Sequence, residues 1–301
     1  RGGRPAPTAL GRAAPAALPA IEGNAPALPT GKGMWVWLPE ETPEGGDATA
    51  MVEHALRHDL THLYVRTGSS RRGFHGAAFL DEILPAAHAA GLRVYGWDFP
   101  YLVNPAADVN RAVAAIHHEA PGGHRLDGFV PDVETPLEGV NLTAGTASAY
   151  ATGLRAAVGP DYPLVVAVPR PSPTMRRIYP YEAVTAPFDA VAPMVYWLHV
   201  DPSDEMDMTA RHLAALGKPL VPIGQAYDAG PEGGPAGIPD RAAIHDFMEA
   251  ADAAGSLGVS FWSWQHADDE AWQAIADGAQ FRPRLPVAGV RAAVTAVAAT
   301  V

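Results

Sequence analysis

The stretch Leu126-Asp127-Gly128-Phe129-Val130-Pro131-Asp132-Val133-Glu134-Thr135-Pro136 (residues 126–136) joins an apolar run to two carboxylates that lie two positions apart. Successive side chains on a β-strand point to opposite faces, so Asp132 and Glu134 are expected to share a face, roughly 6–7 Å apart at the backbone. Burying carboxylates is costly, and two on one face repel each other, which raises the pKa of at least one. The pattern predicts acid–base chemistry at a strand end. The alternative is that both acids cap the next helix or hold an arginine.

This stretch is one of eight short apolar runs that alternate with longer amphipathic runs about every 30 residues. The predicted strands are 34–38, 62–66, 93–98, 126–136, 164–168, 190–197, 219–225 and 258–264. The predicted helices lie near 47–59, 77–90, 106–119, 143–158, just after Thr174, and near 207–216, 240–255 and 269–278.

Strands that each lead into a helix are parallel and buried on both faces, and eight such units in about 250 residues form a closed (β/α)8 barrel, the TIM-barrel type of α/β fold. The rival is an open, doubly wound sheet, which usually carries a glycine-rich phosphate loop after its first strand. Here the first strand is followed by Pro39-Glu40-Glu41-Thr42-Pro43. We therefore expect a barrel domain over residues 31–281.

Composition excludes several classes of function. The 301 residues are 48% hydrophobic, which is ample for a core, and the net charge of -12 argues against a nucleic-acid-binding surface and fits a neutral or weakly charged ligand. The chain has no cysteine, so it forms no disulfide, zinc–thiolate site or cysteine nucleophile. The chain contains no run of about 18 apolar residues, which is the length that a membrane-spanning helix needs, so the sequence predicts no membrane span.

The two ends of the chain differ from the barrel region in composition. Residues 1–30 are rich in Ala, Pro and Gly, and such a segment buries too little surface to order itself. We interpret it as a tether that remains after removal of an export signal, which predicts a secreted or cell-surface protein. Residues 282–301 are rich in Ala and Val, and we expect them to form a C-terminal extension.

In barrels of this type the functional site lies at the carboxyl ends of the strands. The residues expected there are Trp35, Trp37, Arg66, Trp97, Asp98, Asp132, Glu134, Arg170, Tyr196, Trp197, Gln225, Tyr227, Trp262, Trp264 and Gln265. This set holds six of the seven tryptophans, and flat aromatic rings suit the apolar faces of sugar rings. This set of residues predicts a carbohydrate-binding site. The alternative is that some of the aromatic rings pack beneath the helices.

Other strand-end residues have more than one interpretation. Tyr196 is expected to hydrogen-bond a reacting centre, or else to hold a loop. Asp98 is expected to contact Asp132, Tyr196 or the substrate, with a helix cap as the alternative. Arg66 and Arg170 are expected to act mainly as ion-pair partners of carboxylates.

No motif in the chain indicates a metal or a cofactor. His117 and His118 are consecutive in a predicted helix and point apart, so we interpret them as surface residues. The chain has no HExxH, phosphate-loop, GxSxG or EF-hand pattern. We expect neither a catalytic metal nor a cofactor.

The fourth-strand Asp-x-Glu resembles the chitinase-like glycosidase family. That family carries DxxDxDxE at its fourth strand, Met-x-Tyr-Asp at its sixth and a tryptophan at its eighth. The residues similar to this pattern are Asp132, Glu134, Met194, Tyr196 and Trp264. Val130 stands where the family has a further acid, and Trp197 stands where the family has the acid after the tyrosine.

The chain also resembles the Chalaropsis-type lysozyme family, which has Asp-x-Glu on strand four and Trp-Gln on its last strand. Asp132-Val133-Glu134 and Trp264-Gln265 are similar to these motifs. Both resemblances together span about residues 33–280 and imply a glycoside hydrolase-like barrel.

The resemblance implies that Glu134 is a general acid that protonates the glycosidic oxygen, with a pKa raised partly by Asp132. Gln225 stands on the strand where many barrels carry a nucleophile, which favours a substrate-assisted route. In that route a 2-acetamido oxygen attacks, Asp132 orients it and Tyr196 hydrogen-bonds it. The implied substrates are N-acetylated, such as chitin or peptidoglycan strands. The remaining predicted substrate-binding residues are Trp37, Arg66, Asp98, Trp197, Gln225, Tyr227, Trp264 and Gln265.

Two alternatives remain open. The replacement of the family acid by Trp197 favours a carbohydrate-binding barrel without catalysis. A hydrolase of a non-acetylated polysaccharide would use Asp98 or Asp228 as its second carboxylate. The sequence predicts a polysaccharide or oligosaccharide partner and gives no oligomeric state.

Overall fold

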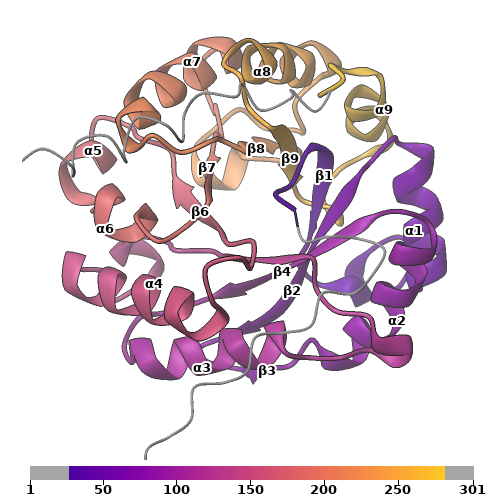
Figure 1. Cartoon of the computed structure of the whole chain (residues 1–301). Coiled ribbons are helices and arrows are strands. Elements are labelled where there is room, and N and C mark those ends of the chain that lie inside the picture. Colours follow the sequence, from indigo (N-terminus) through magenta and orange to yellow (C-terminus); the bar gives the residue numbers. More distant parts are fainter. Residues whose placement is uncertain (1–26, 282–301) are drawn as a thin grey trace, which may run out of the picture.

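The computed structural model describes residues 27–281, in which a ring of helices surrounds a barrel of strands (Figure 1). The sheet has nine strands, and the short β3 (Gly73–Phe74) pairs only with β2, in antiparallel orientation. The strands of the barrel are β1 (Gly31–Val36), β2 (His62–Ser69), β4 (Arg93–Phe99), β5 (Gly128–Pro131), β6 (Val165–Pro169), β7 (Ala190–Met194), β8 (Ile223–Gln225) and β9 (Gly258–Trp262).

These strands run parallel in the order β5-β4-β2-β1-β9-β8-β7-β6. Parallel bridges between Phe129 and Leu164 and between Asp132 and Ala167 bring β5 against β6 and close the ring. The expected (β/α)8 barrel is therefore confirmed.

The helices follow the strands as the amphipathic runs predict. They are α1 (Ala48–Arg57), α2 (Ala77–Ala89), α3 (Pro105–Ile116), α4 (Ala144–Val158), α5 (Met175–Ile178), α6 (Tyr181–Thr185), α7 (Pro202–Leu213), α8 (Arg241–Ala253) and α9 (Asp269–Asp277). Short 3-10 turns lie at η1 (Pro39–Glu41), η2 (Pro121–Gly123), η3 (Pro136–Glu138), η4 (Ala214–Leu216) and η5 (Gly230–Glu232). Asp, Asn or Thr side chains cap six of the α-helices, which satisfies backbone N–H groups at their first turns.

Two apolar cores explain why the strands read as continuous hydrophobic runs. One core fills the barrel and contains Trp35, Tyr64, Tyr95, Trp97, Val130 and Met194. The other lies between the strands and the helices, and includes Met34 and Val36 from the same strand as Trp35. Alternate residues of a strand therefore enter different cores, which is the period-two rule applied on two buried faces.

The predicted boundary of the N-terminal tether is four residues too late. Residues 27–30, which we assigned to the tether, lie against the barrel at the amino ends of the strands. The Tyr95 hydroxyl donates a hydrogen bond of 2.6 Å to the Ala27 carbonyl, and Leu28 packs against the interior core. The rest of the tether and the C-terminal extension lie outside the described residues.

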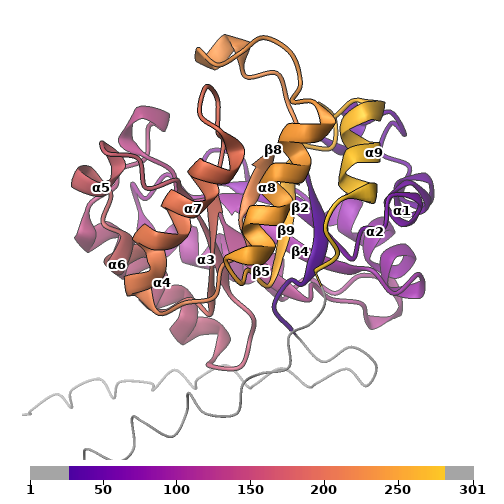
Figure 2. The same cartoon turned by 90° about the horizontal axis from the view of Figure 1, so that it is seen from above.

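In the described part of the chain, no helix combines the length and apolar character needed to cross a bilayer. At the carboxyl ends of the strands, the segment between β8 and α8 rises above the ring of helices, in orange in Figure 2. This segment forms one wall of the site described next.

Candidate active site

A pocket of about 1140 Å³ opens at the carboxyl ends of the strands. Strand ends and the loops after them form its wall, and the side chains that matter below are Trp37, Arg66, Asp132, Glu134, Tyr196 and Trp262. The barrel therefore has a large pocket where the strand-end reasoning predicts a site.

Asp132 and Glu134, the acid pair, both line this pocket. Three hydrogen bonds fix the backbone that carries them: Asp132 N donates to the Asp98 carbonyl at 2.9 Å, Val133 N donates to the Ala167 carbonyl at 3.1 Å, and the Tyr179 hydroxyl donates to the Val133 carbonyl at 2.6 Å. Val133 points into the outer core. The prediction that the two acids share a face, with Val133 opposite, is confirmed.

The pocket environment favours the protonated form of both carboxyls. The pKa of Glu134 is raised to about 7, chiefly by burial and also by the nearby Glu138 and Glu232, against the opposing effect of a backbone hydrogen bond from Thr135. Burial also raises the pKa of Asp132 well above its usual value, with added repulsion from Glu134 and Asp98 and opposition from Arg66. A carboxyl with a pKa near 7 can both donate and accept a proton at neutral pH.

Four tryptophans line the pocket. Trp35 and Trp97 are 1% exposed, lie 5.5 Å apart between ring centroids, and form its base. Trp37 and Trp262 also line the pocket, are only half-buried, and have ring centroids 6.1 Å apart. They provide the flat apolar surfaces that suit a sugar ring.

The prediction that Trp197 and Trp264 bind substrate is wrong in this structure. Trp197 packs against Phe247 of α8 in the outer core. Trp264 is 0% exposed and donates its Nε1–H to Glu44 at 2.9 Å. Trp197 continues the alternation of β7, which places it on the outward side with Val195. Trp264 follows the last residue of β9, Trp262, where strand alternation no longer fixes direction. Trp262 takes the place expected of Trp264.

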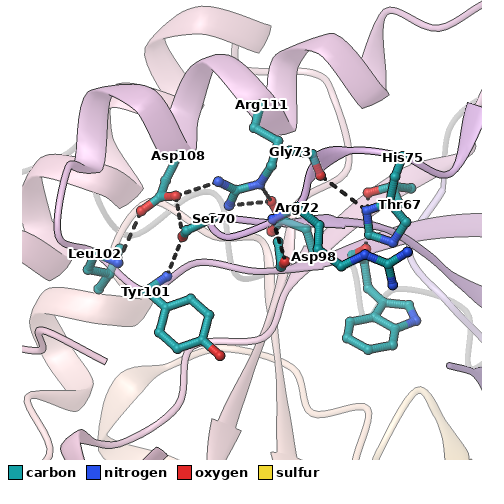
Figure 3. A network of polar contacts seen from close by, with 12 residues as sticks. Thr67, Ser70, Arg72, Gly73, His75, Asp98, Tyr101, Leu102, Asp108 and Arg111 are labelled. Carbon is teal, nitrogen blue, oxygen red and sulfur yellow. Dashed lines mark hydrogen bonds and ion pairs between the residues drawn. The ribbon is translucent and has the colours of Figure 1, made fainter. Parts of the chain in front are cut away.

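The prediction that Asp98 binds substrate is also wrong, because its side chain points away from the pocket. It is 0% exposed, accepts a hydrogen bond of 2.8 Å from Nε of Arg111 on α3, and forms an ion pair with Nη2 of the same arginine at 2.7 Å (Figure 3). Arg111 also pairs with Asp108, whose other oxygen accepts from Leu102 N at 3.0 Å. Ser70 joins the network by bonding Asp108 and accepting from Tyr101 N. Asp98 thus anchors the loop that carries pocket residue Tyr101.

Gln225 and Gln265 lie behind the pocket wall and were wrongly expected to contact substrate. The Gln225 amide donates to the Tyr227 carbonyl at 3.3 Å and accepts from Leu198 N at 3.4 Å. The Gln265 amide oxygen accepts from Trp37 N at 3.4 Å. Both side chains bond to the backbone of loop residues that line or adjoin the pocket, so their effect on the pocket is to position it.

Tyr196, Tyr227, Trp37 and Arg66 do line the pocket, as predicted. The Tyr196 and Tyr227 rings meet edge to face at 5.4 Å, and burial raises the pKa of Tyr196, so its hydroxyl stays protonated at neutral pH. Arg170 lines the pocket as well, and it pairs with Glu205 of α7 as the ion-pair interpretation expects.

Sequence reasoning considered Asp228 but missed two other acids on the loops. Glu138 follows β5, and Glu232 lies in the raised segment after β8, where its Oε2 accepts from the Tyr227 hydroxyl at 2.7 Å. Asp228 lines the same wall, and its Oδ1 accepts from Gly230 N at 2.8 Å and Gly237 N at 2.9 Å. No spacing rule links loop residues to a face of the barrel. Within residues 27–281, no cluster of three or more His, Asp or Glu side chains could hold a metal ion.

Comparison with known proteins identifies the class of fold. No protein-family model matches the chain, and no curated protein matches it. Solved structures do match: a chitinase from Chromobacterium violaceum is 14% identical over 82% of this chain and 98% of that chain, with a TM-score of 0.58. A chitinase-like agglutinin from Robinia pseudoacacia is 14% identical over 82% of this chain and 98% of that chain, with a TM-score of 0.59. A chitinase from Cycas revoluta in complex with (GlcNAc)4 is 14% identical over 82% of this chain and 98% of that chain, with a TM-score of 0.59.

The chain therefore has a glycoside hydrolase-like (β/α)8 barrel, the fold of these chitinases, as the resemblance at the acid pair implies. At such low identity the comparison establishes the fold alone.

Proposed function

We propose that this protein is a glycoside hydrolase that cleaves N-acetylated polysaccharide chains, with Glu134 as the general acid. The observation that carries the proposal is the raised pKa of Glu134, about 7, at the wall of an open pocket with two half-buried tryptophan faces. A carboxyl that keeps its proton near neutral pH can give it to a glycosidic oxygen as the C1–O bond breaks.

The second group in the reaction is the 2-acetamido oxygen of the substrate. Its attack on C1 forms a cyclic intermediate, which water then opens while Glu134 takes back a proton. Asp132 supports this role, because its Oδ1 is buried without a hydrogen-bond partner among the described residues and is available to the acetamido group. Tyr196 lines the same wall and donates its hydroxyl hydrogen to that group.

The other pocket carboxylates fit a nucleophile less well. Asp228 is held by two backbone N–H groups, which lower its pKa, and Glu232 accepts a bond from Tyr227. Asp98, the other partner considered for a non-acetylated substrate, is buried against Arg111. A secreted or cell-surface setting belongs to the proposal as well, since a cell-wall or extracellular polymer is the substrate that it names.

The proposal predicts a loss of activity as pH rises through about 7, because the general acid must be protonated and burial raises the pKa of Glu134 to about 7. The same shift affects stability. Since the folded-state pKa lies above the unfolded value, the contribution of the neutral carboxyl is complete below pH about 4.5 and is lost as pH rises through about 7. A pH profile of kcat/KM checks the prediction, and constant activity up to pH 9 contradicts it.

The test of the substrate-assisted route is a pair of matched substrates, (GlcNAc)4 and its fully de-N-acetylated counterpart. We expect hydrolysis of the first to be faster by at least about a hundredfold, because the acetamido oxygen acts as an intramolecular nucleophile. Reducing-end release measured for both substrates decides the question. Equal rates would show that the acetamido group takes no part, and would point to Asp228 or Glu232.

A second candidate function is sugar binding without turnover. Trp197 stands where the chitinase-like pattern has an acid, and its ring packs against Phe247, so that position gives the pocket no carboxyl. An agglutinin shares the fold. Tight binding of (GlcNAc)4 by the wild type, with no reducing ends released over days, would favour this function over hydrolysis.

A further inference from the structure

A second hollow of about 360 Å³ adjoins the main pocket and shares Trp37 and Arg66 with it. Its other walls come from the loop after β1, around η1, and from the segment between β3 and α2. The two hollows are therefore neighbours, with Trp37 and Arg66 between them. A chain of sugars lying across the acid pair would extend into this second hollow.

Two arginines lie at this junction without a close ion pair to an acid of the described residues, although Asp132 is near enough to Arg66 to influence its pKa. The Arg66 guanidinium lies 5.3 Å from the Trp97 ring centroid and 5.9 Å from that of Trp37. Among the described residues it has no ion-pair partner, and its Nε is buried without a hydrogen bond. Arg72 is exposed on the β2–β3 turn, lines the second hollow, and likewise has no ion-pair partner in the described part of the chain.

The arrangement is unusual for a protein with a net charge of -12. Arg72 lies close enough to Arg66 to lower its pKa, after the larger effect of burial. The acids of the second hollow, Glu40 and Glu82, are exposed at its rim and pair with neither arginine. Unpaired like charges held together at a cavity favour an anion that would bridge them.

The two hollows differ in their balance of charge. Asp132, Glu134, Glu138, Asp228 and Glu232 line the main pocket together with Arg66 and Arg170, whereas Arg66 and Arg72 line the second hollow together with the exposed Glu40 and Glu82. The guanidinium fork matches the two oxygens of a carboxylate. A neutral polymer would leave Arg66 desolvated and unpaired, but a sugar unit with a carboxylate would satisfy it.

We propose that the second hollow is a subsite for a carboxylate-bearing sugar unit, bound by Arg66 and Arg72, so that the preferred substrate is an acidic N-acetylated glycan. This inference rests on the proposed glycosidase function. The overall charge led us to expect a neutral or weakly charged ligand, whereas this proposal names a ligand that carries carboxylates.

Binding in the full chain carrying Glu134→Gln tests the subsite without turnover. The probes are a hyaluronan tetrasaccharide, with uronic carboxylates, and a peptide-free tetrasaccharide of alternating N-acetylglucosamine and N-acetylmuramic acid, with lactyl carboxylates. Each is compared by calorimetry with its own methyl ester, which differs only in charge. We expect at least one acid to bind about tenfold more tightly than its ester.

Adding Arg72→Gln is expected to remove most of this preference for the acid over the ester. The control substitution is Arg211→Gln, which replaces an exposed arginine of α7 in a loose pair with Asp207 and is expected to keep the preference. The preferred acid shows whether the carboxylate comes from a uronic or a lactyl group. Equal binding of acid and ester for both probes, or a ratio that Arg72→Gln leaves intact, overturns the subsite. If the wild type then still hydrolyses (GlcNAc)4, the proposed function stands without it. If no probe is hydrolysed but the ratio holds, the subsite stands and the proposed hydrolysis fails.

Discussion

Replacing Glu134 by Gln is expected to lower the rate of glycan hydrolysis by about 10²–10⁴-fold while (GlcNAc)4 still binds. The amide keeps the size of the side chain but has no proton to give to the leaving oxygen. The Glu134 carboxyl is singled out by its pKa of about 7 and by its place in the pocket wall beside Asp132. Reducing-end release and calorimetry on the same preparation separate lost chemistry from lost binding.

The matched control is Glu182→Gln, an exposed acid on α6 outside the pocket, which should change the rate less than twofold. If Glu134→Gln keeps wild-type turnover, the general acid is another group, and the roles proposed for Asp132 and Tyr196 lose their basis. If both binding and turnover disappear, near-ultraviolet circular dichroism tells whether the variant is folded.

Replacing Arg111 by Met is expected to lower the free energy of unfolding by about 3–5 kcal/mol at pH 8, because it leaves Asp98 charged, buried and unpaired. Asp98 is 0% exposed, and burial raises its pKa to about 6 even with Arg111 beside it. Without the arginine that pKa rises further, so Asp98 is expected to take up a proton and the loss to shrink as pH falls towards 5. Urea unfolding at both pH values measures the two effects.

Arg211→Met is the control for this variant. Its arginine is 71% exposed and lies 3.9 Å from Asp207, so the expected loss is under about 0.5 kcal/mol. A loss below about 1 kcal/mol for Arg111→Met, or one that does not depend on pH, would show that the network in Figure 3 contributes little. The network matters for the site because the Asp98 carbonyl accepts the hydrogen bond from Asp132 N.

The fold and the acid pair could be read from the sequence because both depend on regular alternation. Eight apolar runs with helical runs between them define the barrel without any long-range information. The alternation at β5 continues past its last residue, Pro131, since Asp132 still pairs with Ala167 across the barrel. Asp132 and Glu134 therefore keep the direction that the strand predicts.

The wrongly predicted site residues lie where the alternation of side chains along a strand ends, or where that alternation was not applied. Trp264 follows the last residue of β9, so loop geometry decides its direction. Trp197 lies outward with Val195, as the period of two along β7 already directs it. Asp98 lies next to Trp97, which faces the barrel interior, and the period of two already directs it outward to Arg111. The acids Glu138 and Glu232 come from loops whose course only the three-dimensional structure shows.

A crystal structure of the Glu134→Gln variant with (GlcNAc)4 tests the central claim most directly. The account predicts sugar rings against Trp37 and Trp262, an acetamido group at Asp132, and a glycosidic oxygen about 2.6–3.2 Å from the side chain at position 134. An oligosaccharide bound elsewhere on the barrel, or one whose glycosidic bonds all lie beyond reach of that side chain, would contradict it.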